Sequence, residues 1–94
     1  MTSAPITITR FPLGLKVATP GASDHLTPWE MAACLNRHGL GDWGEVDDED
    51  KATNDAAMVS GGRLLSAYTV RGVQVWVITE ADRRTTTLLL PDEY

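Results

Sequence analysis

The run from Val73 to Thr79 constrains the fold of this 94-residue chain most, because it is apolar on both sides. If the run is a strand, its three valines point to one side while Trp76 and Ile78 point to the other. A strand of an open sheet usually turns one side to water, so its sequence alternates between apolar and polar residues. This strand therefore needs a cover on each face.

The flanking residues predict that this strand is the middle one of a three-stranded antiparallel meander. Arg63 to Val70 is rich in β-forming residues and leads into Arg71-Gly72, a two-residue hairpin connection that glycine makes possible. Glu80 to Arg84 is expected to form the next turn, and Thr85 to Leu90 the last strand, which Pro91 ends.

The N-terminal part of the chain is expected to be extended. Residues Ile6 to Phe11 predict a short strand, and Pro5 and Pro12 on either side of it favour an edge strand or an extended arm. Leu13 to Ala18 is predicted to continue as a second extended piece. A turn is then expected at Thr19-Pro20-Gly21.

A first helix is predicted from Pro28 to His38. The preceding Thr27 and the later Glu30 have the spacing of a capping box, and proline suits the first helical position. Gly39 is expected to be the C-terminal cap of this helix.

A second helix is predicted to begin at Asp47 or Asp48 and to end near Ser60. Acidic residues in its first turn interact favourably with the helix dipole, and two glycines follow its last turn. Its apolar stripe is thin, so we expect the helix to lie on the surface of the fold. That stripe consists of Ala52, Ala56 and Val59, with Met58 alongside.

Together these elements predict an α+β fold in which two helices pack on a three- to four-stranded, mainly antiparallel sheet. The helices would cover one face, and the N-terminal segment, a second copy of the chain or a partner would cover the other. The length predicts a single domain over residues 1–94, with residues 1–5 disordered. A lone cysteine, the lack of a signal-peptide pattern and the lack of a bilayer-length apolar run predict a cytoplasmic protein that binds no membrane.

Negative charge is concentrated in one segment of the chain. The formal net charge is −5, yet the fourteen residues from Asp42 to Asp55 carry seven acids against Lys51, and the rest of the chain is close to neutral. Such a segment repels nucleic acid, and its natural complement is a basic protein surface. The predicted partner-binding face consists of Asp42, Trp43, Glu45, Asp47, Asp48, Glu49 and Asp50.

Each candidate in this segment has a structural alternative. The acids can be the capped start of a solvated helix, and Trp43 can either fill the gap between the helices or serve as an exposed anchor. The segment lacks the ligand alternation and the glycine of a calcium loop, so we expect no metal. Cys34 and His38 have a spacing that can hold a transition metal, but a packed helix end explains the pair as well. No cofactor is predicted.

A small nuclease or toxin is the main alternative from another class. Arg63, Glu80 and Asp82 would act with the neighbouring Arg83 and Arg84 on a phosphodiester. General acid–base cleavage needs a His or Glu within reach of the scissile phosphate, and the spacing of this set matches no such motif. We therefore expect no catalytic residues and no enzymatic activity.

Several blocks of the sequence are similar to a known group of proteins. Residues 38–46 (HGLGDWGEV), 54–56 (NDA), 62–68 (GRLLSAY), 75–83 (VWVITEADR) and 86–94 (TTLLLPDEY) resemble small proteins encoded on bacterial plasmids and other mobile elements, over roughly residues 14–94. The resemblance transfers no catalytic assignment. It implies an inhibitor of a host defence complex, of the anti-CRISPR or antirestriction type. A further alternative is a homodimeric accessory protein of a mobile element, in which self-association buries the second face of the sheet.

Overall fold

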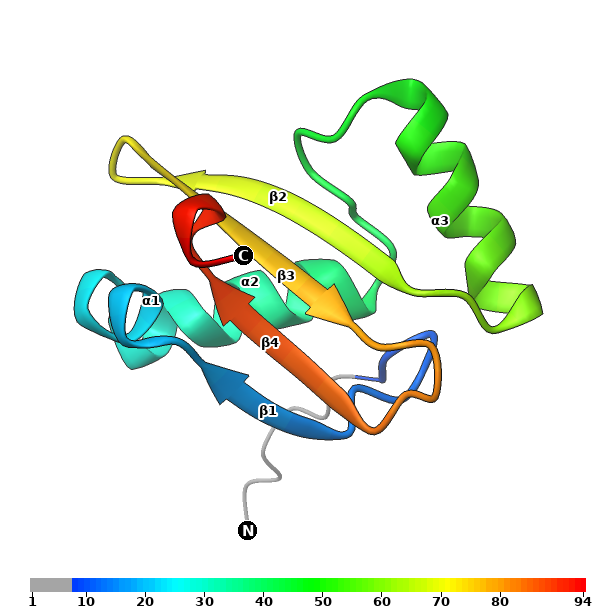
Figure 1. Ribbon diagram of the computed structural model, residues 1–94, viewed down its shortest axis with the longest axis horizontal. Helices are drawn as coiled ribbons and strands as arrows, with labels where there is room; N and C mark the ends of the chain where they lie inside the picture. The colour runs from blue at the N-terminus through cyan, green and yellow to red at the C-terminus, as the bar shows by residue number, and fades with distance from the viewer. Residues whose placement is uncertain (1–7) are drawn as a thin grey trace, which may run out of the picture.

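The computed structural model describes residues 8–94, which form three helices and a four-stranded mixed sheet (Figure 1). The α+β class and the mainly antiparallel sheet are thus confirmed. The elements in chain order are β1 Leu15–Ala18, α1 Pro20–His25, α2 Pro28–Gly39, α3 Asp48–Ser60, β2 Leu64–Val70, β3 Val73–Thr79, β4 Thr85–Leu89 and the 3₁₀ turn η1 Pro91–Glu93.

The sheet has the strand order β1-β4-β3-β2. Strands β2, β3 and β4 form the predicted antiparallel meander, with Ser66 opposite Val77 and Val77 opposite Leu88. Strand β1 pairs with β4 in parallel, with Lys16 opposite Thr86. This parallel pair depends on residues about seventy positions apart, and no local pattern predicts it.

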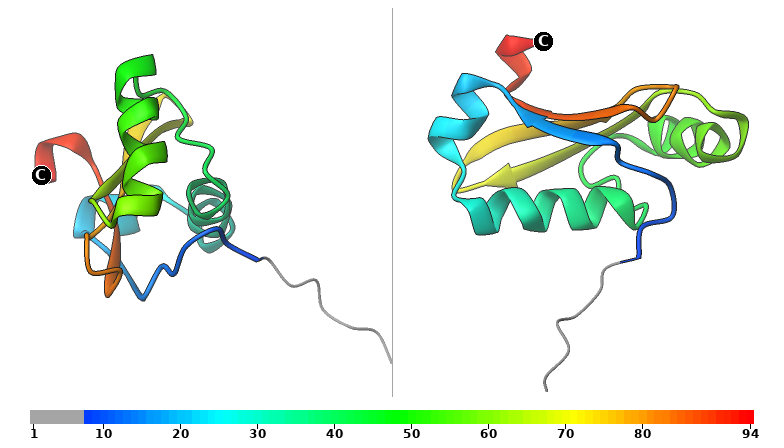
Figure 2. Two further views of the ribbon diagram at one scale, coloured as in Figure 1. Left: turned by 90° about the vertical axis from the view of Figure 1, so that its right-hand side faces the viewer. Right: turned by 90° about the horizontal axis from the view of Figure 1, so that it is seen from below.

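Helix α2 begins at the predicted capping box. The Thr27 hydroxyl accepts a hydrogen bond from the Glu30 backbone at 3.2 Å, and the Glu30 carboxylate accepts one from the Thr27 backbone at 2.8 Å. The helix crosses one face of the sheet, as Figure 2 shows, and buries Cys34 against the side chains of β3 and β4. The prediction for its C-terminus is wrong, because Gly39 is the last helical residue and Leu40 is the cap.

Helix α1 replaces the turn predicted at residues 19–21. Thr19 is its N-cap and Pro20 occupies the first helical position, a combination that begins a helix as readily as a turn. The helical outcome is decided by contacts that are distant in sequence. Ala22 is fully buried in the core, and the Glu93 carboxylate accepts a hydrogen bond from the Gly21 backbone at 2.9 Å.

The strand predicted at residues 6–11 is not observed over Ile8–Phe11, which has no regular secondary structure. Phe11 turns inward instead and stacks on Trp43 at a ring-centroid distance of 6.0 Å. The neighbouring Arg10 backbone donates to the carbonyl of Gly39 at 2.8 Å and so ties this segment to the end of α2. Residues 6–7, and the disorder expected for residues 1–5, lie outside the described residues.

Helix α3 has the predicted bounds but a different buried face. Asn54 and Ala57 point inward, whereas Val59, which was placed on the apolar stripe, is 91% exposed. The reason is visible in Figures 1 and 2: α3 lies at the end of the sheet beside β2 and does not cover a face. The Asn54 amide donates to the Leu65 carbonyl at 2.7 Å and accepts from the Leu65 backbone at 3.2 Å, so it pairs with the strand edge.

The two faces of the sheet are covered differently. Helices α1 and α2 cover one face, while η1 lies on the opposite face, where Tyr94 contacts Trp76 edge-to-face at 5.7 Å (Figure 2). Ile78 and Leu89 are buried on that second face, but Leu15 is 67% exposed. Two helices, α2 and α3, were expected to cover one face of the sheet. Helix α2 does cover a face, and α3 does not. Within residues 8–94, no helix has the length and apolarity that a bilayer crossing requires.

Candidate functional site

The acidic segment begins in the loop between α2 and α3, and this loop is fixed to the edge of β2. Gly44 has a φ of +71° and forms an isolated bridge with Ala67. On either side of it, the Trp43 carbonyl accepts from the Ala67 backbone at 3.1 Å, and the Glu45 backbone donates to the Ala67 carbonyl at 2.7 Å. The sheet thus determines where the following carboxylates leave the fold.

Trp43 is a core residue, and its assignment to the partner-binding face is wrong. Its side chain is only 4% exposed, it packs with Phe11 and His38, and its indole N–H donates to Asp55 at 2.9 Å. Three glycines around it shape a loop that folds the ring inward. The exposed tryptophan is Trp29, at the first turn of α2, which the charge pattern did not single out.

Asp42 is compensated by a cation of its own chain. Its carboxylate lies 2.7 Å from the Arg37 Nε and also accepts a hydrogen bond from the Gly44 backbone at 3.1 Å. The bond from Arg37 is the main reason why the pKa of Asp42 is lowered. Asp42 therefore holds the loop and contributes little to an outward negative field.

Five of the seven predicted residues remain exposed together at the N-terminal end of α3. We call them the acidic face: Glu45, Asp47, Asp48, Glu49 and Asp50. In the part of the chain that the structure describes, none of them is within 4.0 Å of a cationic nitrogen. Figure 1 shows this end of α3 projecting away from the sheet.

Two members of the acidic face also have local structural roles. Asp47 is the N-cap of α3 and accepts a hydrogen bond from the Asp50 backbone at 2.8 Å. Glu45 accepts one from the Thr69 hydroxyl at 2.9 Å. The side chains of Asp48 and Glu49 have no such bond among the described residues, so they can be changed without removing a structural contact.

The possible metal ligands of the chain do not converge. Over residues 8–94, no group of three His, Cys, Asp or Glu side chains is placed to hold an ion. Cys34 is buried, which raises the pKa of its thiol. His38 lies one helical turn further on, and both of its ring nitrogens are hydrogen-bonded to hydroxyl groups.

These bonds to His38 belong to a directed chain of buried hydrogen bonds. Thr86 donates to the Leu13 carbonyl at 2.7 Å, so its oxygen accepts the hydroxyl hydrogen of Thr79, also at 2.7 Å. Thr79 consequently accepts from the Nε2–H of His38 at 2.8 Å, and Nδ1 accepts from Ser66 at 2.6 Å. This arrangement defines the neutral tautomer that carries its hydrogen on Nε2. Burial is the main cause that lowers the pKa of His38 to about 4.

The residues proposed for a nuclease lie around the β3–β4 turn and are engaged in local contacts, with Arg63 and Arg83 both bonded to Glu80. Arg63 pairs with Glu80 at 3.3 Å, whereas Arg84 lies 4.0 Å from Asp82 in a separate, exposed pair. Arg83 donates at 2.6 and 2.9 Å to two backbone carbonyls, at the end of α3 and just after it. Its guanidinium therefore joins α3 to the β3–β4 turn.

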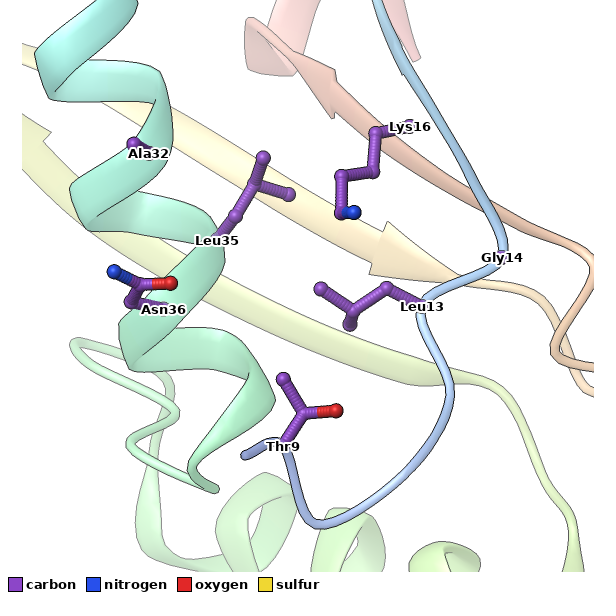
Figure 3. A pocket seen from close by; sticks show the side chains of 7 residues that line it. All are labelled: Thr9, Leu13, Gly14, Lys16, Ala32, Leu35 and Asn36. Atoms are coloured by element: carbon purple, nitrogen blue, oxygen red, sulfur yellow. The ribbon is translucent and has the colours of Figure 1, made fainter. Parts of the chain in front are cut away.

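A pocket of about 470 Å³, which no sequence pattern predicts, lies between α2 and β1 (Figure 3). Its walls come from two segments whose sequences contain no binding motif. Leu13 and Lys16 lie around β1, and Leu35 and Asn36 lie on α2. The nearest signal in the sequence is the extended piece at residues 13–18, but that signal does not reveal which helix lies opposite.

No protein-family model, no curated protein and no solved structure matches this chain.

Proposed function

We propose that this protein is a non-enzymatic binding protein whose acidic face docks on a basic protein surface. The observation that carries the proposal is the set of five neighbouring carboxylates, exposed at one helix end and unpaired with cations in residues 8–94. An N-cap uses one of these acids, and the dipole of one helix gains little from four more. Their outward field is complementary to a surface rich in Lys and Arg.

The partner that we propose is a bacterial defence complex, of the CRISPR effector or restriction type. This step comes from the resemblance to mobile-element proteins, and the charge pattern supports it because the nucleic-acid channels of such complexes are basic. The carboxylates would compete with phosphate for those cations. Direct binding of nucleic acid by this chain is disfavoured for the same electrostatic reason.

Charge reversal at Asp48 and Glu49 is expected to weaken capture of the partner by at least about tenfold, because two attractive contacts become repulsive. The partner is first captured from a bacterial lysate on the immobilised protein and identified, and its affinity is then measured by interferometry. We expect the wild-type affinity to fall as the NaCl concentration rises. The variant is Asp48→Lys with Glu49→Lys.

The matched control reverses two exposed acids elsewhere, Asp24→Lys with Asp92→Lys, and so changes the net charge equally. We expect the control to bind as the wild type does. Thermal unfolding of both variants checks that the helix start, where acids contribute about 0.3–1 kcal/mol each, is retained. An equal loss of affinity in both variants would contradict a binding site localised at the acidic face. Cleavage of RNA or DNA by the pure protein, with or without magnesium, would favour the nuclease alternative.

A further inference from the structure

The two outer strands of the sheet, β1 and β2, differ in how many of their outward backbone groups are hydrogen-bonded by the rest of the described chain. At β2, the backbone of Leu65 is paired with the Asn54 amide, and the backbone of Ala67 is paired with Trp43 and Glu45. An edge occupied in this way cannot accept another strand. Natural sheets protect their edges by such coverings.

Among residues 8–94, no group covers the edge of β1 in this way. The backbone of Leu15 donates to Arg84 and that of Thr19 to Leu88, so every second residue of β1 faces β4. Lys16 and Ala18 therefore direct their N–H and C=O groups outward, where no group of residues 8–94 bonds them. All four residues of β1 are exposed, and the view of Figure 2 from below shows this strand at the edge of the sheet.

The pocket lies directly beside this open edge. Figure 3 shows Leu35 of α2 pointing toward Leu13 and Lys16, which approach it from the β1 side. Two leucines thus supply an apolar surface, and Lys16 supplies an ammonium group that is in no ion pair within the described chain. A strand added to β1 would place every second side chain over this pocket.

We propose that the β1 edge and this pocket bind an extended peptide segment of a partner protein, with one apolar side chain between Leu13 and Leu35 and one acidic side chain at Lys16. Main-chain hydrogen bonds to Lys16 and Ala18 supply affinity that is independent of sequence. The pocket supplies specificity, which is how strand addition at a sheet edge works in general. This site lies across the sheet from the edge that carries the acidic face, and it does not depend on that face.

A second copy of the chain fits the same edge poorly. Two copies of β1, paired antiparallel about Val17, would place Lys16 opposite Ala18 on the pocket side. The two lysines would then be diagonal neighbours, about 7–8 Å apart. No carboxylate of residues 8–94 lies within 4.0 Å of Lys16 to compensate them. An acidic peptide, in contrast, would be attracted electrostatically to the same lysine.

The test uses the full chain, immobilised and panned against a phage-displayed library of random hexapeptides. We expect enrichment of sequences in which an acidic residue is two positions from an apolar one, since alternate residues of a strand share a face. Titration of the best synthetic peptide into ¹⁵N-labelled protein should shift the amide signals of Lys16, Ala18 and Leu35 until they saturate.

Three variants make this test specific. Ala18→Pro removes an outward N–H without removing a bond to β4. Ala32→Trp fills the pocket from an exposed position on α2. Each variant should lower the affinity for the peptide at least about tenfold. Lys16→Glu should invert the preference, so that the peptide with lysine in place of its acid binds better. Far-UV circular dichroism and thermal unfolding check that each variant is folded.

Four results would overturn the proposal. They are the absence of enriched peptides, amide shifts centred away from β1, full peptide binding by folded Ala18→Pro, and a concentration-dependent dimer that Ala18→Pro dissociates. The last of these would assign the edge to a second copy of the chain.

Discussion

Replacing Gly44 with alanine is expected to lower the free energy of unfolding by about 3–5 kcal/mol. A methyl group at this position would lie 2.1 Å from the Ala67 carbonyl oxygen, and the backbone φ of +71° is itself strained for alanine. Strain of this kind costs about 1–3 kcal/mol, and each of the two loop-to-strand hydrogen bonds beside Gly44 contributes about 0.5–1.5 kcal/mol. Such a loss is a large fraction of the stability of a small fold.

Gly61→Ala is the matched control for this experiment. Gly61 also has a positive φ, of +92°, but a methyl group there would have no heavy atom within 4 Å. We expect it to cost only the backbone strain, about 1–2 kcal/mol. Urea unfolding at neutral pH measures both variants. If the two lose the same amount, the close approach of Gly44 to β2 has no energetic role.

Acidification from pH 7 to pH 4 is expected to remove about 3 kcal/mol of stability through His38 alone. The folded protein keeps this imidazole neutral down to a pKa of about 4, because burial disfavours its charged form. The unfolded chain takes up the proton near the ordinary histidine pKa of about 6.5. Between these two values the unfolded state binds more protons, so stability falls as the pH falls, and above about 6.5 the group contributes no slope.

The upper part of this pH window belongs to His38 and not to the carboxylates. The hydrogen bond from Arg71 is the main cause that lowers the pKa of Glu30 to about 2, and the bond from Thr19 lowers the pKa of Glu93. A lowered carboxylate pKa gives stability that is present above the unfolded value, near 4.5, and is lost only below it. A slope between about pH 6.5 and pH 5 therefore reports on the histidine.

Urea unfolding at a series of pH values tests this assignment with two variants. In His38→Gln the amide can accept from Ser66 and donate to Thr79 but cannot titrate, so the slope above about pH 5 should flatten. His25→Gln is the matched control, since His25 is only partly buried and bonds the Val70 carbonyl. A slope that persists in His38→Gln and disappears in His25→Gln would contradict the role given to the buried imidazole.

The candidate site was only partly predictable from the sequence. The exposed acids from Asp47 to Asp50 follow from local charge density at a helix start, and the structure leaves them without cationic partners in residues 8–94. Trp43 and Asp42 belong to the same segment but differ in environment, because one side chain packs on Phe11 and the other pairs with Arg37. Neither contact is encoded in the segment itself.

The sequence by itself determined the elements whose causes are local. Three local signals act over two to four residues each: the capping box at Thr27, the acids at the start of α3, and the hairpin at Arg71-Gly72. The observed bounds of α2, α3, β2 and β3 therefore lie within a residue or two of the predicted ones. A hydrogen bond between near neighbours forms without any contribution from distant parts of the chain. The thin apolar stripe of α3 predicted a helix at the surface of the fold, which is confirmed, although Ala52, Ala56 and Val59 of that stripe are exposed.

Only the tertiary structure decided how these elements meet. It made residues 20–25 a helix by burying Ala22, and it paired β1 with β4 in parallel. It also bonded His38 to hydroxyl groups of β2 and β3, and through Thr79 to a third hydroxyl on β4. It also blocked one sheet edge with Asn54, whereas no group of residues 8–94 bonds the other edge, which lies beside a pocket. Each outcome depends on groups that are far apart in the chain, and such contacts form only where the whole fold offsets the entropy of bringing them together.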